Sequence, residues 1–308
     1  MTALSQRVGA AAPRSPRRRR HRPPGLPWIL PALVVSVGIL YYCIGYTGYI
    51  STLDWDGTSP LQEFVGGANY LKMVKDPVFW ESLQHTGIFF VVSFALRVLL
   101  GFVFASLLHS RLYLRTFYKV LIFIPVVLAT ATVAPVFRLI YAPTGTLNQL
   151  LEAVGLGNLT QLWLSNGAFA LFAVITIQVW QSTGVSFVLY YAAMGQIDPD
   201  IVEAARLDGA GDFRVLRSIV WPGVRGTTVA LAILTAIDSL KTFDVPFLVT
   251  SGGPSFATEF LGTQIYRVSI TYAQVGYGGA LSIVLLVLAL SAAIVINVTA
   301  RRRERFDV

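Results

Sequence analysis

Six long stretches of the chain are apolar and nearly free of charge, and shorter polar segments separate them. A membrane-spanning helix needs about 20 mostly apolar residues, and each stretch reaches that length. We therefore predict spanning helices at residues 28–50, 86–108, 118–140, 168–194, 224–248 and 274–298. The second stretch contains Arg97, and the fifth contains Asp238, Lys241 and Asp244. The pattern predicts an all-α integral membrane protein with six transmembrane helices.

Two prolines, Pro125 and Pro135, lie within the third predicted span. Proline lacks the N–H group and disturbs the preceding helical turn. We therefore expect kinks at these residues, which a helix bundle tolerates where neighbouring groups satisfy the freed carbonyls.

The composition agrees with this class. Hydrophobic residues make up 55% of the 308 residues and charged residues 13%, whereas soluble domains carry about 25% charged residues. This balance excludes a disordered chain and argues against an ordinary soluble enzyme. The single cysteine, Cys43, lies in an apolar run, so neither an intrachain disulfide nor a cysteine-based zinc site is expected.

The basic residues, 24 against 16 acidic ones, are distributed unevenly. Under the predicted topology, 18 of them lie on one side, in the two tails, the 109–119 turn and the 195–225 loop. Only Lys72, Lys75 and Arg267 lie on the other side. Cytoplasmic segments are enriched in Lys and Arg, so we expect a multi-pass protein of the cell membrane with both termini in the cytoplasm. Topology then explains the basic excess, and we expect no nucleic-acid binding.

We divide the chain into a basic cytoplasmic tail (1–26), a six-span domain (27–300) and a short basic cytoplasmic tail (301–308). The first tail is rich in Arg, Pro and Ala and is expected to be disordered. Arginines before an apolar run are also typical of signal peptides. No small-residue cleavage site follows Tyr41–Tyr49, so we expect the first span to be retained.

The loop at residues 195–223 is long and patterned. Asp198 before Pro199 indicates a helix start, since an acidic cap followed by proline suits the first turn. Gly209 and Gly211 interrupt that helix, and Asp212 is expected to cap a second short helix. The apolar residues recur at helical spacing in both segments, at Ile201, Ala204, Ala205 and Leu207 and then at Phe213, Leu216, Ile219 and Val220. Such a loop suits either an amphipathic helix on the membrane surface or a docking element for a cytoplasmic partner.

The same loop carries a known signature. The permease subunits of bacterial binding-protein-dependent ABC importers have Glu-Ala-Ala, three residues, Gly, nine residues, Ile, one residue and Leu-Pro. This chain resembles them in Glu203-Ala204-Ala205, Gly209, Ile219 and Trp221-Pro222, with tryptophan in place of leucine. We call residues 195–223 the coupling loop, because the resemblance implies that it contains a coupling helix that transmits ATPase movements.

Further stretches resemble the carbohydrate-uptake branch of this family, typified by the maltose and glycerol-3-phosphate importers. These are Phe64–Tyr70, Asp76–Trp80, Phe243-Asp244, Thr250–Pro254 and Gly276-Tyr277. The Gly-Gly-Pro sequence within them is similar to the first of the two permease subunits of that branch. The resemblance covers residues 28–298.

The resemblance implies a type I importer permease core that forms half of a translocation pore for a sugar, polyol phosphate or related solute. The implied partners are a second permease, two ATPase subunits, an extracytoplasmic solute-binding protein and membrane lipid. ATP and Mg would be used by the ATPases, and we expect no cofactor on this chain, which lacks the phosphate-loop pattern GxxxxGKS or GxxxxGKT. The residues expected to couple to the ATPase are Glu203, Ala204, Ala205, Asp208, Gly209, Phe213, Ile219 and Pro222.

Polar residues inside the spans are candidates for the substrate pathway. On the fourth span, Gln178, Gln181 and Ser182 fall on one helical face beside Trp180. Amide and hydroxyl groups next to an aromatic wall suit a sugar. Hydrogen bonds between helices are the alternative use of such residues.

The fifth span repeats this spacing with Asp238, Lys241 and Thr242, and Ser239 lies beside them. Lys241 could pair with Asp238 or Asp244, or remain free to meet an anionic solute. Arg97 on the second span could pair with either aspartate or face a vestibule. The candidates for the pathway from these two spans are Arg97, Asp238, Ser239, Lys241 and Thr242.

Two other classes of function remain open at this stage. An ion-coupled secondary transporter would use similar spans but would need no docking helix. A membrane-embedded enzyme would need a catalytic constellation at depth, and no nucleophile or metal-ligand cluster accompanies Arg97, Asp238 and Lys241. We therefore expect neither catalytic nor metal-binding residues in this chain.

Overall fold

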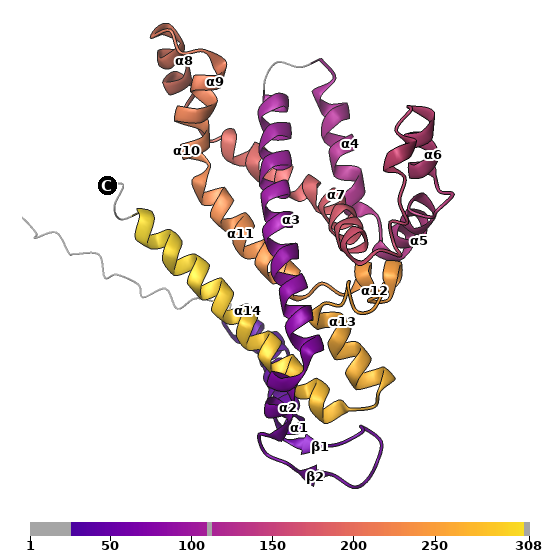
Figure 1. Cartoon of the computed structure of the whole chain (residues 1–308). Coiled ribbons are helices and arrows are strands. Elements are labelled where there is room, and N and C mark those ends of the chain that lie inside the picture. The colour runs from indigo at the N-terminus through magenta and orange to yellow at the C-terminus, as the bar shows by residue number, and fades with distance from the viewer. Residues whose placement is uncertain (1–25, 110–112, 305–308) are drawn as a thin grey trace, which may run out of the picture. The chain divides into compact units, whose positions relative to one another are not determined.

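The computed structural model describes residues 26–109 and 113–304, and nearly all of its regular elements are helices (Figure 1). In chain order the elements are α1 (Leu26–Ile50), β1 (Leu53–Asp54), β2 (Glu63–Phe64), α2 (Ala68–Lys75), α3 (Pro77–His109), α4 (Arg115–Val127), α5 (Thr130–Ile140), α6 (Thr146–Ala153), η1 (Gly157–Leu159), α7 (Gly167–Met194), α8 (Pro199–Leu207), α9 (Asp212–Val215), η2 (Leu216–Val220), α10 (Trp221–Gly223), α11 (Arg225–Leu240), α12 (Asp244–Thr250), α13 (Leu261–Tyr266), η3 (Arg267–Thr271) and α14 (Val275–Glu304).

The chain divides into two compact units, residues 1–45 and 46–308. In the first unit the described residues form most of α1. The tails predicted at 1–26 and 301–308 fall largely outside the described residues, although the backbone of α14 continues to Glu304.

Four helices of the described chain are long and apolar enough to cross a membrane. They include Ile29–Ile50, Pro77–His109, Gly167–Met194 and Val275–Thr299, which match the predicted first, second, fourth and sixth spans. The count rises to six if each of two bent helix pairs forms one span. The prediction of an all-α membrane protein is therefore confirmed, while the third and fifth spans differ from the continuous helices that we expected.

The third span is broken rather than kinked. α4 and α5 meet at an angle of 97°, and the break lies at Leu128 and Ala129, between Pro125 and Pro135 rather than at either proline. Both break residues have extended backbone, which frees the Leu128 carbonyl from helical bonding. Gln181 on α7 donates its side-chain N–H to that carbonyl at 3.2 Å, as expected where a neighbouring helix satisfies a broken span.

The fifth span ends earlier than predicted. α11 stops at Leu240, and a non-helical step separates it from α12. Pro246 accounts for this because it cannot donate to the Thr242 carbonyl and would clash with it in a continuous helix. At its other end α11 is bent by 62° from the helical segment Asp212–Gly223, so the coupling loop leads directly into this span.

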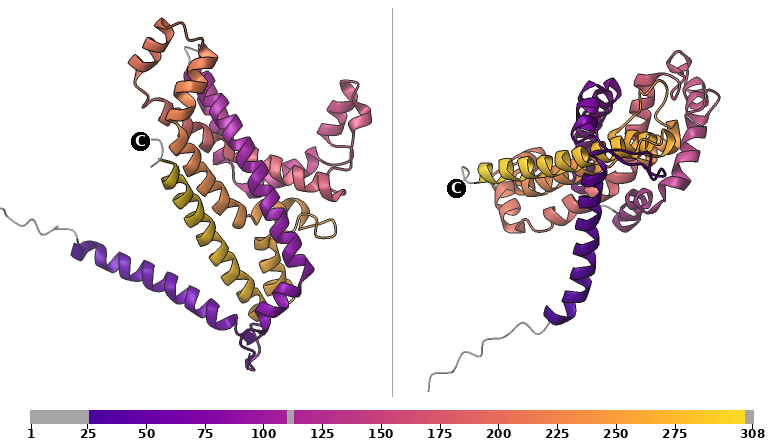
Figure 2. Two further views of the ribbon diagram at one scale, coloured as in Figure 1. Left: turned by 60° about the vertical axis from the view of Figure 1, so that its left-hand side comes forward. Right: turned by 90° about the horizontal axis from the view of Figure 1, so that it is seen from below.

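Within the second unit, α3 forms the central contact of the bundle. It packs against α7 and α11, and α11 packs against α14 (Figure 2). α3 approaches α7 closely at Gly101, where a Cβ atom would lie 2.7 Å from the Ser186 Cβ. A side chain at this position would force the two helices apart.

Short elements form a lobe at the opposite end of α3 from the coupling loop (Figure 1). β1 and β2 pair antiparallel, and the buried Asn69 side chain donates to the carbonyls of Ser51 and Leu53. The Tyr277 hydroxyl at the start of α14 donates to Asp76 at 2.7 Å. The Asn69 bonds hold the first loop together, and the Tyr277 bond joins it to the last span.

Candidate functional site

The first helix of the coupling loop begins as its sequence predicts. The Asp198 side chain accepts a hydrogen bond from the Asp200 backbone N–H at 3.0 Å, and Pro199 occupies the first helical position. Glu203 and Ala204 follow on α8 and are both exposed. The cap therefore fixes the start of the helix and leaves the Glu-Ala-Ala segment accessible.

Glycine is required at the turn that follows α8. Gly209 has a φ of +84°, in the left-handed region that other L-residues adopt only at a cost. The backbone N–H groups of Gly209 and Ala210 donate to the carbonyls of Arg206 and Ala205, and these bonds close the end of the helix. Gly211 has an ordinary φ of −72°, so only the first glycine is needed for its conformation.

The second helix differs in one detail from the prediction. Gly211, not Asp212, is the capping residue, and no side chain caps this helix. Asp212 instead pairs with Arg206 across the turn at 3.1 Å, with both side chains largely exposed. The helix continues as α9, the π-helical η2 and α10, so the loop is a helix–turn–helix as expected.

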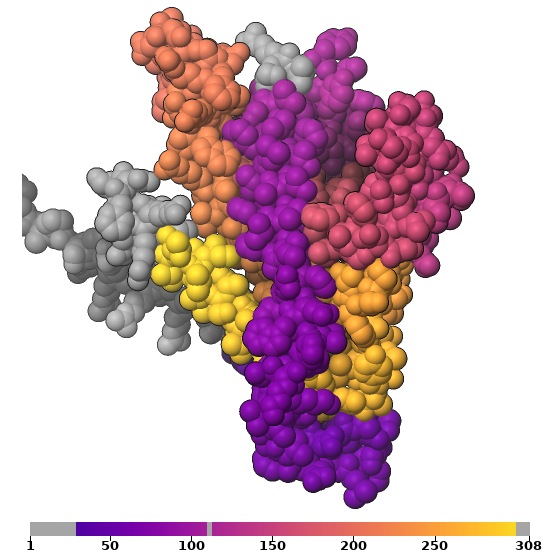
Figure 3. All heavy atoms as spheres, viewed as in Figure 1, coloured from indigo at the N-terminus to yellow at the C-terminus, as the bar shows by residue number. Residues whose placement is uncertain are grey.

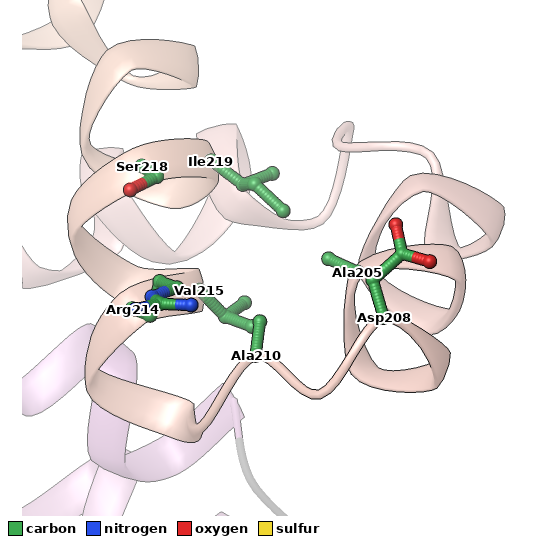
Figure 4. Close-up of a pocket in the computed structure, with 7 residues that line it drawn as sticks. All are labelled: Ala205, Asp208, Ala210, Arg214, Val215, Ser218 and Ile219. Carbon is green, nitrogen blue, oxygen red and sulfur yellow. The ribbon is translucent and has the colours of Figure 1, made fainter.

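A small pocket separates the two helices of the coupling loop. It has a volume of about 230 Å³. Figure 4 shows Ala205 on α8 and Asp208, which caps the end of α8, facing Val215 and Ile219 across it. Arg214 and Ser218 complete the wall on the second helix, and Ala210 lies at the turn. The wall combines the small residues Ala205 and Ala210 with the branched apolar residues Val215 and Ile219.

The coupling loop projects from one end of the bundle (Figure 3). The Phe213 side chain is 76% exposed there, which is unusual for a large apolar residue unless a partner or membrane covers it. Asp208 and Gly209 are also exposed, while Ile219 and Pro222 are half-buried. The predicted coupling residues thus occupy one continuous protrusion.

The structure joins three polar residues that lie far apart in the sequence. Arg97 on α3 donates to Asp238 on α11 at 3.0 Å and to Ser182 on α7 at 2.7 Å. Its side chain is 4% exposed, whereas that of Asp238 is 50% exposed. Of the alternatives for Arg97, the structure therefore has the pairing with Asp238 rather than a position open to a vestibule. We call these three residues the Arg97 network.

The other candidates on α7 divide between two environments. Gln181 is buried and bonded to the Leu128 carbonyl, which matches the alternative of bonding between helices. Trp180 is 39% exposed and packs edge-on against Phe137 of α5 at 5.3 Å. Gln178 is half-buried, and its side chain forms no hydrogen bond with the described residues. Trp180 and Gln178 are thus the accessible members of this group, and they lie on different sides of α7.

The candidates at the end of α11 do not share one helical face, because the helix stops before Lys241. The buried side chains of Ser239 and Thr242 donate to the carbonyls of Thr235 and Asp238. Lys241 is exposed and forms no ion pair among the described residues. Of the alternatives for Lys241, the structure therefore has the side chain without an ion-pair partner among the described residues, rather than a pairing with Asp238 or Asp244.

An ion pair that the sequence did not point to joins Glu259, in the loop before α13, to Arg267, at the start of η3. Arg267 donates to Glu259 at 2.7 Å and to the Ser251 carbonyl at 2.8 Å. Glu259 is fully buried, and this burial raises the pKa of its carboxyl group against the opposing effect of Arg267. The sequence around Glu259 contains no motif that predicts this pair, because Arg267 reaches Glu259 only in the folded structure.

Comparisons with known proteins agree with the geometry. A family model described as "Binding-protein-dependent transport system inner membrane component" matches residues 97–305. The probable ABC transporter permease protein YurN of Bacillus subtilis is 34% identical over 267 residues, covering 86% of this chain and 91% of the relative. The trehalose/maltose transport system permease protein MalF of Thermococcus litoralis is 34% identical over 281 residues, covering 90% and 93%.

A solved structure shares the fold. It is a chain of a bacterial ABC transporter involved in the import of the acidic polysaccharide alginate. The TM-score is 0.75 at 20% identity, with 89% of this chain and 96% of that chain covered. At this level of identity the likeness concerns the arrangement of helices, and it extends over nearly the whole of both chains.

Proposed function

Because this chain belongs to the family of binding-protein-dependent transport system inner membrane components, we propose that it forms one half of the pore of an ATP-driven importer. A second, homologous permease supplies the other half. The exposed Glu-Ala-Ala helix and glycine turn of the coupling loop carry this proposal, because they form a protruding element suited to a separate subunit.

We assign ATP hydrolysis to two separate ATPase subunits in the cytoplasm. The chain has no phosphate-loop pattern, so neither ATP nor Mg is expected to bind to it by that route. The contact residues proposed for the ATPase are Glu203, Ala204, Ala205, Asp208, Gly209, Phe213, Ile219 and Pro222. The uneven distribution of basic residues supports a cytoplasmic position for this loop and for both termini.

We propose that the lobe at the other end of α3 faces the extracytoplasmic solute-binding protein. This assignment follows from the topology, since the lobe and the coupling loop lie at opposite ends of the same membrane-spanning helix. The hydrogen bonds from Asn69 and Tyr277 would transmit a push on the lobe to α14.

The proposed solute is a sugar or a related polyhydroxylated compound. Relatives named for trehalose and maltose support this class, and so do the accessible polar and aromatic groups on α7 and α11. The residues proposed for the pathway are Gln178, Trp180, Gln181, Ser182, Asp238, Ser239, Lys241, Thr242 and Arg97. Four of them, Gln181, Ser239, Thr242 and Arg97, are buried, so their part is to hold neighbouring groups in place.

The proposed mechanism is alternating access. Closure of the ATPase pair on ATP moves the coupling loop, and α11 moves with it because the helical segment Asp212–Gly223 leads directly into that span. The pore then opens outward and receives solute from the binding protein. Hydrolysis of ATP restores the inward-facing state.

Uptake into vesicles tests this function. The complex that co-purifies with this chain is reconstituted with its binding protein, and uptake of labelled maltose and trehalose is measured with either internal ATP or an imposed ion gradient. We expect uptake that requires ATP and the binding protein. Uptake driven by the ion gradient alone would contradict the proposal and favour a secondary transporter.

A further inference from the structure

The Arg97 network is asymmetric, and this asymmetry points to a division of labour. Arg97 lies at the meeting point of α3, α7 and α11 and is almost completely buried. Asp238 uses Oδ2 to accept from Arg97, whereas Oδ1 accepts no hydrogen bond among the described residues. Half of the Asp238 side chain is exposed. One end of the pair is thus fixed in the bundle and the other is open.

A carboxylate half-exposed on a spanning helix is not expected to face lipid, because a charge at membrane depth costs at least about 2.5 kcal/mol. Its open side therefore faces a water-filled path or a partner subunit. Since Arg97 balances its charge, the pair presents a strong hydrogen-bond acceptor without a net negative charge. Such an acceptor suits a hydroxyl donor better than it suits an ion.

The neighbouring groups favour the water-filled path. Ser182, the third member of the network, shares a helical face with Gln178 one turn earlier on α7. Gln178 is half-buried and has no side-chain partner among the described residues, so its amide is available to a ligand. A carboxylate acceptor and an unpartnered amide, linked through Ser182 and Arg97, are polar groups of the kind that orient a sugar.

We propose that Arg97 is a positioning residue that orients Asp238 so that its free Oδ1 accepts a hydrogen bond from a hydroxyl group of an uncharged solute. The inference rests on the proposed function and narrows its solute class. Arg97 is too buried to touch the solute. Its guanidinium group holds the carboxylate from one side while Ser182 holds the guanidinium group from the other.

Thiol labelling tests whether position 238 faces water. Cys43 is the only cysteine, so Cys43→Ala provides a cysteine-free background for Asp238→Cys. An unpaired Arg97 could prevent that variant from folding, so Asp238→Cys is also combined with Arg97→Met in the same background. The control is Leu99→Cys, at a position that is 56% exposed on an apolar part of α3. The assembled complex is treated with the membrane-impermeant reagent MTSET. We expect labelling at 238 and little at 99; equal protection of both positions would overturn the inference.

Transport kinetics test the positioning role. For ATP-driven uptake of maltose and trehalose, we expect Arg97→Met to raise KM at least about tenfold, as for loss of a charged hydrogen bond, with a smaller change in kcat. Arg97→Lys should recover part of the loss. The double variant Arg97→Met with Asp238→Asn leaves no unpaired charge at this site. If the ion pair served only to stabilise the fold, this variant would have the wild-type KM, and that result would overturn the inference. Failure of the wild type to take up any solute with ATP would instead contradict the proposed function.

Discussion

The coupling loop and the Arg97 network place their charged groups in opposite surroundings. In the loop, the paired side chains of Arg206 and Asp212 are 62% and 86% exposed, whereas the Arg97 side chain is 4% exposed. Water can replace a partner that is lost at the surface, but it cannot do so inside the bundle. Substitutions in the loop should therefore weaken binding to partner subunits more than they lower the stability of the fold. Substitutions in the bundle should lower the stability of the fold more than they weaken that binding.

The largest effect on stability is expected where α3 and α7 touch. In Gly101→Ala the new Cβ would collide with Ser186, so we expect the free energy of unfolding to fall by about 3 kcal/mol. Gly87→Ala on the same helix is the control, because no atom lies within 4 Å of its Cβ position; alanine should be neutral or stabilising there. Denaturant unfolding in detergent measures both. Equal loss in the two variants would show that the contact does not limit packing.

A smaller effect is expected at the break in the third span. Gln181→Leu leaves the Leu128 carbonyl without its donor, and we expect a loss of about 1–2 kcal/mol in the same unfolding measurement. Gln178→Leu, one turn away and without a bonded side chain in the described structure, should change stability little. If the two variants lose the same amount, the bond from Gln181 does not support the break.

The turn of the coupling loop should combine a small effect on stability with a large one on coupling. Gly209→Ala must adopt a φ near +84°, which costs about 1 kcal/mol, or else reorient the two helices. Gly211→Ala has an ordinary φ and no atom within 4 Å of its Cβ position, and it is the control. We expect only Gly209→Ala to lose ATP hydrolysis stimulated by the binding protein. Full stimulation in that variant would show that the turn geometry is dispensable.

The smallest effect is expected for the surface pair in the loop. Asp212→Asn removes the exposed ion pair with Arg206, and stability should change by less than about 0.5 kcal/mol. Any difference from the wild type should vanish in about 1 M salt, where the screening length is about 3 Å. A difference that persists at high salt would indicate that this pair acts by more than charge.

The two regions also differ in how far the sequence predicts them. The coupling loop is local: Asp198 caps its own helix, and Gly209 turns between adjacent segments, so spacing alone indicates the helix–turn–helix. Its one error, the cap assigned to Asp212, arose because Arg206 competes for that carboxylate across the turn. Local signals therefore fix the shape of this loop almost completely.

The bundle interior depends on contacts between distant segments. The pairing of Arg97 with Asp238 joins residues that lie 141 positions apart in the sequence. Local spacing could suggest only the two pairings of Lys241, with Asp238 and with Asp244, and it could not rank them against a partner on another helix. The early end of α11 followed from Pro246, a signal that was present in the sequence but was outweighed by the apolar run. The 97° break in the third span could not be located from its prolines alone, because Gln181 on another helix supports it.

The most direct test of the central claim is whether this chain binds an ATPase through its coupling loop. A tagged wild type, Phe213→Asp and the control Leu61→Asp are purified in mild detergent, since Phe213 and Leu61 are similarly exposed at opposite ends of the molecule, 76% and 82%. We predict that all three retain the second permease and that only Phe213→Asp loses the co-purifying ATP hydrolysis. Hydrolysis that is absent from the wild type, or undiminished in Phe213→Asp, would contradict the account.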